Sequence, residues 1–382
     1  MTTAPQELTQ PILQFGTSRF LQAHVDLFVS QALAGTDGAG KALGGITVVQ
    51  TTDRPDGAAR IAALASGAAY PVRVRGIAHG ERIDRTLECS SVKAAVQASA
   101  AWPALREAVA KHVQVIVSNT ADRGYQLDAG DSAAALTSDT PPASFPAKLL
   151  VLLYGRWQTD HASTLTLFPC ELIERNGEVL RDVVVALAHE WKLEDTFAVW
   201  LRDHCVWANS LVDRIVSEAI EPVGAVAEPY ALWAIERQPR LVLPCEHPAI
   251  VLTDDLASHE RLKLFLLNAG HTFLAERWLK DGRPADETVR EAMADTALRA
   301  ELEALWAEEI LPVFEALGVL PQAQAYLVDV RERFENPFLN HRIADIAQNH
   351  AQKTQRRFGP IVEMAGEQLV GLVQPRLNAA LP

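Results

Sequence analysis

One short stretch of the 382-residue chain holds a glutamate, a lysine, an asparagine and a histidine among regularly spaced apolar side chains. Residues 260–278 read ERLKLFLLNAGHTFLAERW, and this spacing predicts an amphipathic helix. At about 100° per residue, Lys263 and Asn268 lie about 140° apart on such a helix, with Glu260 and His271 between them. All four polar side chains can therefore border one cleft.

These residue types suit the reduction of a ketone, in which the carbonyl oxygen becomes negative and must receive a proton. A lysine ammonium in a partly dry site can give and take that proton, which suits Lys263 as the general acid/base. Asn268 can donate an amide N–H to the developing oxyanion, His271 can hold substrate hydroxyls, and Glu260 can relay protons to solvent. The residues fit a structural interpretation as well, with Glu260 and Lys263 as a surface pair and His271 in the core.

The N-terminal part of the chain has the order of elements that positions such chemistry in α/β proteins. An apolar segment at residues 11–15 is followed by a turn at Gly16, an amphipathic stretch at 19–34 and a second apolar segment at 46–50. This strand–turn–helix–strand order predicts the opening of a doubly wound α/β domain. Two further apolar runs predict parallel strands buried on both faces, at residues 113–117 and 164–168.

The C-terminal part has a different character. From about residue 258 onwards strand patterns are scarce, and helical stretches rich in Ala, Leu, Glu and Arg predominate. Single hydrophobic cores stop growing at about 250–300 residues, so a chain of this length favours two domains. We predict a nucleotide-binding α/β domain at residues 1–245 and a mainly α-helical domain at residues 246–382.

The turn after the first predicted strand is a candidate cofactor loop. In the fingerprint G-x-G-x-x-G, glycines let the backbone approach a pyrophosphate at a helix N-terminus, but residues 16–21 (GTSRFL) keep only the first glycine. From its spacing alone, this loop favours an ordinary tight turn over a cofactor loop. Asp53, after the strand at 46–50, could accept a ribose hydroxyl and favour NAD over NADP, or be a solvated turn residue. Residues 118–120 (SNT) close another strand, at the edge where open α/β sheets bind ligands.

Charge and composition exclude several kinds of partner. A formal net charge of −13 disfavours nucleic acid and anionic membranes, because both bind basic faces. The four cysteines form no C-x-x-C pair and the eleven histidines show no ligand spacing, so we expect no metal site. We interpret the cysteines as reduced thiols of a cytoplasmic protein.

Seven segments resemble, in the same order, the polyol-specific long-chain dehydrogenases, also called the mannitol dehydrogenase family. Lys263, Asn268 and His271 match the family's K-x4-N-x2-H signature, and residues 15–21 resemble its F-G-x-G-x-F-L cofactor loop, with Ser18 replacing the second glycine. The other similar segments are residues 118–120 (SNT), 169–177 (PCELIERNG), 209–215 (NSLVDRI), 228–233 (EPYALW) and 333–338 (RFENPF) with Lys353. The form of residues 169–177 resembles the uronate branch, which contains the fructuronate and tagaturonate reductases.

The resemblance implies a Rossmann-type N-terminal domain, a helical C-terminal domain, no catalytic metal, and Lys263 as the general acid/base. Its implied cofactor is NAD, with NADP left open. Leu172 stands where the polyol enzymes carry an oxyanion-donating asparagine, so Asn268, together with Asn176, is expected to act. The implied cofactor-binding residues are Gly16, Thr17, Ser18, Phe20, Thr52, Asp53, Asn119 and Thr120.

A sugar acid has a carboxylate, so cations on the C-terminal helices are candidate substrate ligands. Residues 341–356 predict one helix with Arg342 and Lys353 on a polar stripe, 11 residues or ~16 Å apart. Both cannot bind one carboxylate if that helix is unbroken, and the stripe also fits a solvated helix face.

The predicted reaction is hydride transfer between NAD(H) and a tagaturonate- or fructuronate-like keto sugar acid. Two alternatives are a dehydrogenase of neutral polyols such as mannitol or arabinitol, and a catalytically silent nucleotide-binding protein. A metal-dependent dehydrogenase is a remote further alternative. The expected partner is the small-molecule substrate, and the expected assembly is a monomer or a weak homo-oligomer.

Overall fold

The computed structural model describes residues 8–53, 57–120, 124–369 and 371–381, which form two compact units. The sheet unit comprises Met1–Arg73, Thr86–Ala227 and Ala231–Leu256, and the helical unit comprises Val74–Arg85, Glu228–Tyr230 and Ala257–Pro382. The helical unit thus takes two short segments from the N-terminal two-thirds of the chain. The domain boundary at residues 245/246 stays a prediction.

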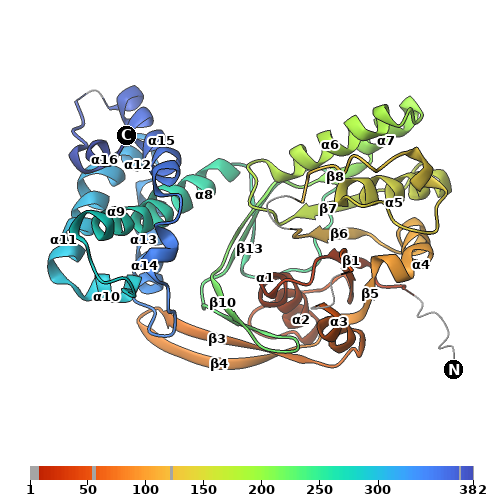
Figure 1. The fold of residues 1–382 in the computed structure, drawn as a ribbon, viewed down its shortest axis with the longest axis horizontal. Helices are drawn as coiled ribbons and strands as arrows, with labels where there is room; N and C mark the ends of the chain where they lie inside the picture. The colour runs from red at the N-terminus through yellow and green to blue at the C-terminus, as the bar shows by residue number, and fades with distance from the viewer. Residues whose placement is uncertain (1–7, 54–56, 121–123, 370, 382) are drawn as a thin grey trace. The chain divides into compact units, whose positions relative to one another are not determined.

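A six-stranded sheet forms the centre of the sheet unit (Figure 1). Its order is β5-β2-β1-β6-β7-β8, and all five pairings are parallel. The strands are β1 (Ile12–Phe15), β2 (Ile46–Gln50), β5 (Val92–Gln97), β6 (Val115–Ser118), β7 (Leu165–Pro169) and β8 (Cys205–Trp207). The chain order reverses direction across β1 and β6, which is the topological switch point of a doubly wound sheet. The predicted α/β fold class is confirmed.

Helices cover this sheet because its strands are buried on both faces. The side chains of Phe15, Trp102 and Phe197 lie in one core cluster that joins one sheet face to four helices: α4 (Ala98–Lys111), α5 (Phe145–Thr159), α6 (Asn176–Glu190) and α7 (Asp195–Asp203). Figure 1 shows α5, α6 and α7 lying together beyond β6–β8. The remaining helices of the sheet unit are α1 (Arg19–Leu21), the π-helical η1 (Gln22–Asp26), α2 (Leu27–Ala34), α3 (Ala58–Ala65) and the short 3₁₀-helix η3 (Ala133–Leu136).

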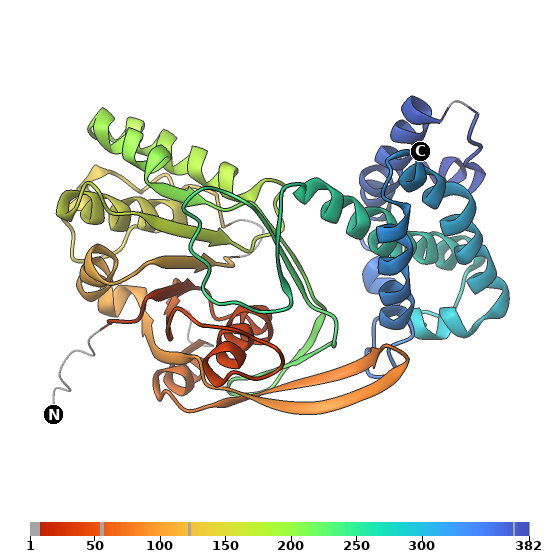
Figure 2. The ribbon, with the colours of Figure 1, turned by 180° about the vertical axis from the view of Figure 1, so that it is seen from behind.

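Two smaller sheets were not predicted. One has the order β10-β11-β3-β4, from Val216–Ala219, Ala225–Ala227, Tyr70–Ala78 and Glu81–Cys89. The other has the order β13-β12-β9, from Ile250–Thr253, Leu232–Glu236 and Ser210–Asp213. The long β3 and β4 ribbon is clearest in Figure 2. Its two-residue turn, His79-Gly80, has positive φ angles of 54° and 77°, as tight hairpin turns require.

Within the helical unit, the tip of that ribbon is bound by α13 (Leu320–Phe334). The backbone N–H groups of His79 and Gly80 donate to the Glu332 carboxylate, at 3.1 and 2.7 Å. The guanidinium groups of Arg75 and Arg82 lie 4.0 and 4.4 Å from the centre of the Phe338 ring. These contacts explain why a segment so early in the chain belongs to the helical unit.

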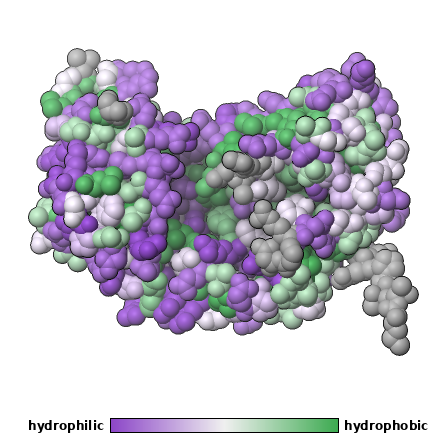
Figure 3. Space-filling model, in the orientation of Figure 1, coloured by the Kyte–Doolittle hydropathy of each residue, from purple (hydrophilic) through white to green (hydrophobic). Residues whose placement is uncertain are grey.

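The rest of the helical unit is a bundle, as the sequence predicted beyond residue 258. Its helices are α8 (Leu256–Leu262), the π-helical η4 (Lys263–Asn268), α9 (Ala269–Asp281), α10 (Val289–Ala294), α11 (Thr296–Ala304), the π-helical η5 (Leu305–Ile310), α12 (Leu311–Ala316), α13, α14 (Ile343–Ile346), α15 (His350–Gln368) and α16 (Pro375–Ala380). Trp306, Phe314 and Phe358 are fully buried at its centre. The face of this unit seen in Figure 3 is mostly hydrophilic. No helix among the described residues is both long and apolar enough to cross a membrane.

Candidate active site

The glycine turn after β1 brings the ends of β1 and β6 into contact. Gly16 has a φ of +119°, and its N–H donates to the Val49 carbonyl at 3.0 Å. A Cβ atom at Gly16 would lie 2.7 Å from the carbonyl oxygen of Asn119. Both the φ angle and this close approach require glycine, so the single glycine that the loop keeps is the one that the geometry needs.

Ser18 connects the predicted cofactor loop to the turn after β6. Its Oγ accepts a hydrogen bond from the Leu21 N–H, which makes Ser18 the N-cap of α1, and it donates to Asn119 Oδ1 at 3.3 Å. The Asn119 amide in turn donates to the Cys170 carbonyl at 2.8 Å. The Thr17 carbonyl accepts from the Gln22 side chain. Gly16, Thr17, Ser18 and Asn119 are therefore one hydrogen-bonded structure.

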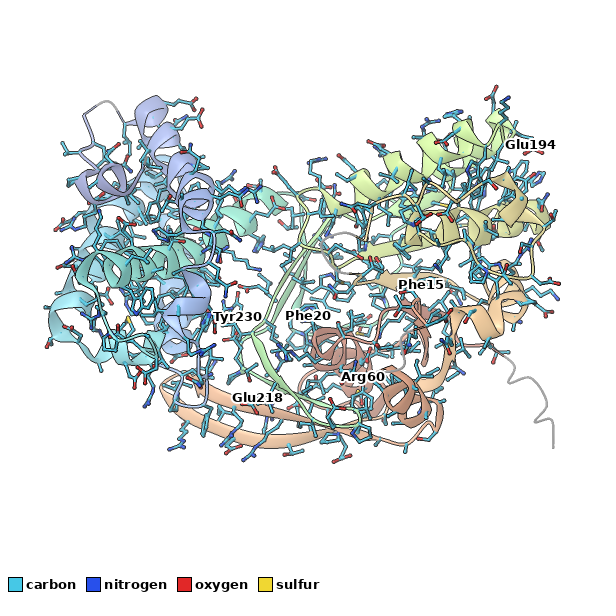
Figure 4. All side chains as sticks on the ribbon, viewed as in Figure 1. Phe15, Phe20, Arg60, Glu194, Glu218 and Tyr230 are labelled. Carbon is cyan, nitrogen blue, oxygen red and sulfur yellow. The ribbon has the colours of Figure 1, made fainter. Side chains whose placement is uncertain are left out.

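Phe20 is the second residue of the helix that follows this loop. Its ring stacks on His24, with 4.8 Å between the ring centres. Figure 4 labels Phe15 at the end of β1 and Phe20 on α1, on either side of the glycine turn. Phe20 remains half-buried, so part of its ring is accessible beside the loop.

Glu171 holds the turn after β6 in place, and the sequence analysis did not identify it. Its carboxylate is buried and accepts hydrogen bonds from the Ser118 hydroxyl at 3.0 Å and from the Thr120 N–H and hydroxyl, both at 2.9 Å. The Tyr125 hydroxyl donates to it at 3.2 Å. The one available signal was an acidic residue directly after a buried apolar strand, where a carboxylate needs several donors.

Asp53 lies at the carboxyl end of β2, as the ribose interpretation requires. Its Oδ1 accepts from Nε2 of Gln97, the last residue of β5, at 2.5 Å and from Oγ of Ser99, in the first turn of α4, at 2.6 Å. These two bonds fix the carboxylate at the sheet edge, although the residue is exposed. Thr52 is exposed beside it, and its carbonyl accepts from the Gln50 side chain. The structure therefore brings Thr52 and Asp53 to the same sheet edge as the glycine turn.

The predicted catalytic helix is continuous from α8 to α9, but its central turn is π-helical. Residues Lys263–Asn268 form η4, and the Ala269 N–H donates to the Leu264 carbonyl, five residues earlier. The estimate of 140° between Lys263 and Asn268 assumed a regular α-helix and was wrong for this reason. A π turn takes in one more residue, so it carries Asn268 back toward the side of the helix on which Lys263 lies.

Neighbouring side chains stabilise this π turn. The indole N–H of Trp306 donates to the Leu266 carbonyl at 3.2 Å. The Asn268 carbonyl accepts from Thr272 Oγ1 at 2.9 Å and from Arg357 Nη1 at 3.2 Å. These donors satisfy carbonyls in the region where the regular helical bonding pattern is interrupted. Gly270 follows directly because a Cβ there would lie 2.8 Å from Trp306 and 3.2 Å from Phe334.

The side chain of Asn268 is half-buried and makes no hydrogen bond to any residue that the structure describes. The hydrogen bonds that described side chains make with Asn268 go to its backbone carbonyl. Its amide N–H groups are thus available to a bound molecule, as the oxyanion role requires. Lys263 and Glu260 are half-buried on the same helix.

His271 is buried and surrounded by rings and cations. Its imidazole stacks on Phe334 with 4.3 Å between ring centres and meets His341 edge-on at 4.8 Å. Burial lowers the pKa of His271 well below its usual value, and the positive charges of His341, Arg333, Arg357 and Lys353 lower it further. His271 is therefore neutral at physiological pH, so one ring nitrogen can donate and the other can accept.

The three predicted substrate residues, Asn176, Arg342 and Lys353, have different surroundings in the structure. The Asn176 amide is buried and donates to the carbonyls of Pro169, Glu171 and Ser210, while its oxygen accepts from two backbone N–H groups. These bonds use the whole carboxamide, so Asn176 has a structural role and cannot serve as an oxyanion donor. We therefore do not retain it as a substrate ligand.

The predicted single helix at residues 341–356 was wrong. The chain forms α14 and α15 with a break between them, at which Asn349 adopts a left-handed φ of 56°. Arg342 precedes α14 and pairs with Asp345 at 3.2 Å, on the exposed surface. Lys353 is half-buried on α15 and donates to the Ile346 carbonyl at 2.7 Å. Lys353, but not Arg342, is thus among the charges that act on His271.

No group of three or more His, Cys, Asp or Glu side chains that could hold a metal ion occurs in the described part of the chain. The four cysteines are buried, unpaired thiols.

A parallel sheet whose glycine turn lies at the switch point is a Rossmann-type fold, and the polar helix suits dehydrogenases that act on CH–OH groups. The chain belongs to the mannitol dehydrogenase family. Residues 10–243 match the family model described as the mannitol dehydrogenase Rossmann domain, and residues 255–373 match that of the mannitol dehydrogenase C-terminal domain. The protein is accordingly an oxidoreductase of this family.

Three relatives illustrate the relationship. The chain is 32% identical over 376 residues to an altronate oxidoreductase of Halalkalibacterium halodurans, covering 93% of this chain and 70% of the relative. It is 32% identical over 384 residues to an altronate oxidoreductase of Bacillus subtilis, covering 94% and 76%. Among solved structures, the Pseudomonas fluorescens mannitol 2-dehydrogenase ternary complex with NAD and D-mannitol has a TM-score of 0.68 at 17% identity, covering 97% and 83%. The last similarity concerns the fold alone.

Proposed function

We propose that this oxidoreductase transfers a hydride between NAD(H) and a keto sugar acid of the tagaturonate or fructuronate type, giving the corresponding aldonate. Altronate, which the names of two relatives contain, is such an aldonate. The observation that carries the acid class is the positive charge of Arg357 and Lys353 near His271, which no acidic side chain in the described part of the chain neutralises, whereas Glu228 neutralises Arg333. An anionic substrate would be attracted there, whereas a neutral polyol would gain nothing from these charges.

NAD fits the carboxyl end of the parallel sheet. Gly16 leaves the space that a Cβ would fill, and Asp53 is held where it can accept a ribose hydroxyl. The Asp53 carboxylate would repel the phosphate of NADP, which favours NAD. The other residues proposed to hold the cofactor are Thr17, Ser18, Phe20, Thr52, Asn119 and Thr120. When bound, NAD accepts or supplies the hydride.

Residues of the helix α8–η4–α9 would transfer the proton and stabilise the negative oxygen. Lys263 donates a proton to the substrate oxygen during reduction and removes it during oxidation. Asn268 stabilises the negative oxygen with its available amide N–H. Neutral His271 orients substrate hydroxyls, and Glu260, one turn before Lys263, exchanges the proton with solvent. Four buried thiols are in keeping with our proposal of a cytoplasmic location.

The decisive experiment follows the loss of NADH absorbance with purified protein. Tagaturonate, fructuronate and fructose are each tested with NADH and NADPH, and Lys263→Ala serves as the control. We expect turnover of a keto uronate with NADH and a loss of about 10²–10⁴-fold in the control. Turnover of fructose alone would overturn the sugar acid assignment. Absence of turnover with all three substrates, despite NADH binding, would favour a catalytically silent protein.

A further inference from the structure

Two half-buried cations on α15 lack the acidic partners that most other cations of the helical unit have. Lys353 and Arg357 lie four residues apart, so their side chains share one face of the helix. Neither forms an ion pair with an acidic residue in the described part of the chain. By contrast, ion pairs with Asp or Glu are made by Arg277, Lys280, Arg283, Arg299, Arg331, Arg333, Arg342 and Arg376.

This arrangement has a cost in stability. Like charges four residues apart destabilise a helix, and both groups here are half-buried. Burial lowers the pKa of each side chain, and for Lys353 the charge of Arg357 contributes as well. An anion between the two cations would offset both the repulsion and the cost of burying the charges. The lack of an acidic partner for Lys353 and Arg357 is therefore explained by a ligand that supplies the negative charge.

The hydrogen bonds of Arg357 show where such an anion would lie. Nη1 of Arg357 donates to Thr272 Oγ1 at 2.8 Å and to the Asn268 carbonyl at 3.2 Å. A guanidinium has five N–H donors in a planar fork, and its other donors have no partner among the residues described. A fork of this kind matches a carboxylate, which it binds through two parallel hydrogen bonds. The bonds to residues 268 and 272 hold this fork beside the π turn of the catalytic helix.

We propose that Arg357, with Lys353, binds the carboxylate of the substrate, and that Arg357 links carboxylate binding to the position of Asn268. The proposal rests on the proposed function, since it concerns the same substrate. Arg357 touches the carboxylate and, through its bond to the Asn268 carbonyl, also fixes the π turn from which the Asn268 amide extends. A substrate that engages Arg357 stiffens this turn, whereas a neutral ketose leaves it without that support. The enzyme thereby discriminates in the chemical step as well as in binding.

The test compares a keto uronate with fructose, which lacks the carboxylate. Arg357→Met and Lys353→Met are measured beside Arg356→Met, which removes the same charge from the adjacent, exposed position of α15. We expect Arg357→Met to lower kcat/KM for the keto uronate by about 100-fold and for fructose by less than about tenfold, since only the keto uronate loses a hydrogen bond between two charged groups. Lys353→Met should show the same preference more weakly, and Arg356→Met should change neither substrate.

Thr272→Val separates the two roles of Arg357. It removes the hydroxyl that accepts from Arg357 Nη1 and donates to the Asn268 carbonyl, and it leaves the charge of Arg357 in place. We expect kcat to fall with both substrates while their ratio stays constant. Added guanidinium should restore part of the keto uronate activity of Arg357→Met but not that of Thr272→Val. If Arg357→Met does not fold, Arg357→Lys, which keeps the charge without the fork, takes its place with an expected loss of about tenfold.

The outcomes distinguish this inference from the proposed function. A wild-type enzyme that turns over only fructose contradicts the proposed function, and the inference with it. A wild-type enzyme that turns over the keto uronate, with equal effects of Arg357→Met and Arg356→Met, contradicts the inference alone. Equal losses for both substrates in Arg357→Met would reduce Arg357 to a structural support of the π turn and would likewise overturn the carboxylate site.

Discussion

Two asparagines that were both predicted to act on the substrate occupy opposite kinds of surroundings. In the sheet unit, Asn176 uses its whole carboxamide to hold the backbone of three neighbouring segments. In the helical unit, Asn268 has a bonded backbone and an unbonded carboxamide. At the cofactor edge of the sheet, the Asn176 carboxamide is fully hydrogen-bonded within the protein. On the catalytic helix, the Asn268 carboxamide has N–H donors that no described residue uses. Polar groups of the first kind fix geometry, and those of the second kind can do chemistry.

The strongest test of this comparison exchanges the two asparagines separately for alanine. Asn268→Ala should lower kcat by about 10²–10³-fold, as loss of an oxyanion donor does elsewhere, without changing the melting temperature. Asn176→Ala removes several buried hydrogen bonds and should lower the melting temperature by about 5–10 °C, with kcat of the folded enzyme nearly unchanged. Steady-state kinetics and thermal unfolding check both. The comparison fails if the two variants have the same profile.

Unlike Asn176, Asp26 of the sheet unit is a buried polar residue whose hydrogen bonding within the described part of the chain is incomplete, and this allows a second test. It is fully buried in η1, where its Oδ2 accepts from the Tyr70 hydroxyl at 2.7 Å, and no described residue forms a hydrogen bond with its Oδ1. Burial raises the pKa of Asp26 to about 7. The neighbouring Tyr70 and Cys89 also have raised pKa values, that of Cys89 about 12, so they stay neutral in this range. Asp26 alone of these three groups titrates near neutral pH.

The sign of the effect follows from linkage. A carboxyl group with a raised pKa in the folded state gives stability that is complete below its unfolded pKa of about 4 and is lost as the pH rises through 7. Between pH 5 and pH 8 this contribution should fall by about 2–3 kcal/mol. Burial lowers the pKa values of His247, His271 and His341, which act in the opposite direction, so the effect of Asp26 is measured as the difference in melting temperature between the wild type and Asp26→Asn, in which these histidines are unchanged. From pH 5 to pH 8 the melting temperature of the wild type should fall relative to that of Asp26→Asn, which imitates the protonated acid. Parallel pH profiles of the two proteins would show that Asp26 does not titrate in this range.

The smallest effect is expected at Glu171, where four donors converge on one carboxylate. Glu171→Gln replaces one acceptor oxygen by an NH₂ group that faces donors, so the turn at Ser118–Thr120 must shift. We expect the KM for NADH to rise about tenfold, with kcat changed by less than about twofold. Glu174→Gln, at an exposed position three residues later, is the matched control. A fall in kcat with an unchanged KM would assign Glu171 to the reaction rather than to the cofactor turn.

The sequence predicted the elements with strong periodicity and did not predict those that depend on distant partners. The four buried strands predicted at residues 11–15, 46–50, 113–117 and 164–168 lie within a residue or two of β1, β2, β6 and β7. The ribbon of β3 and β4 was missed although residues 70–78 alternate and His79-Gly80 is a hairpin turn. That signal was present and was not used.

The π turn could not be predicted, because a period of 3.6 residues describes residues 260–278 whether or not one turn is widened. Its cause lies elsewhere in the chain, in the Trp306 indole and the Arg357 guanidinium that bind its carbonyls. No local sequence pattern distinguished Arg357 from the other cations of this segment. The predicted unbroken helix favoured Arg342 instead. The break at Asn349 requires a left-handed backbone conformation. Asparagine tolerates this conformation, but its presence in a sequence does not predict it.

The helical unit is not a continuous piece of the polypeptide. Its buried Arg333, 3% exposed, pairs with Glu228, 2% exposed, and its Glu332 binds the ribbon tip at His79 and Gly80. About 250 residues separate the ribbon tip from Glu332 in the sequence. During synthesis the ribbon is therefore made long before the helix to which it binds. For the same reason, a fragment that starts at residue 257 would bury an arginine without its counter-charge. Evolution could therefore exchange this module between proteins only together with two short pieces of its neighbour.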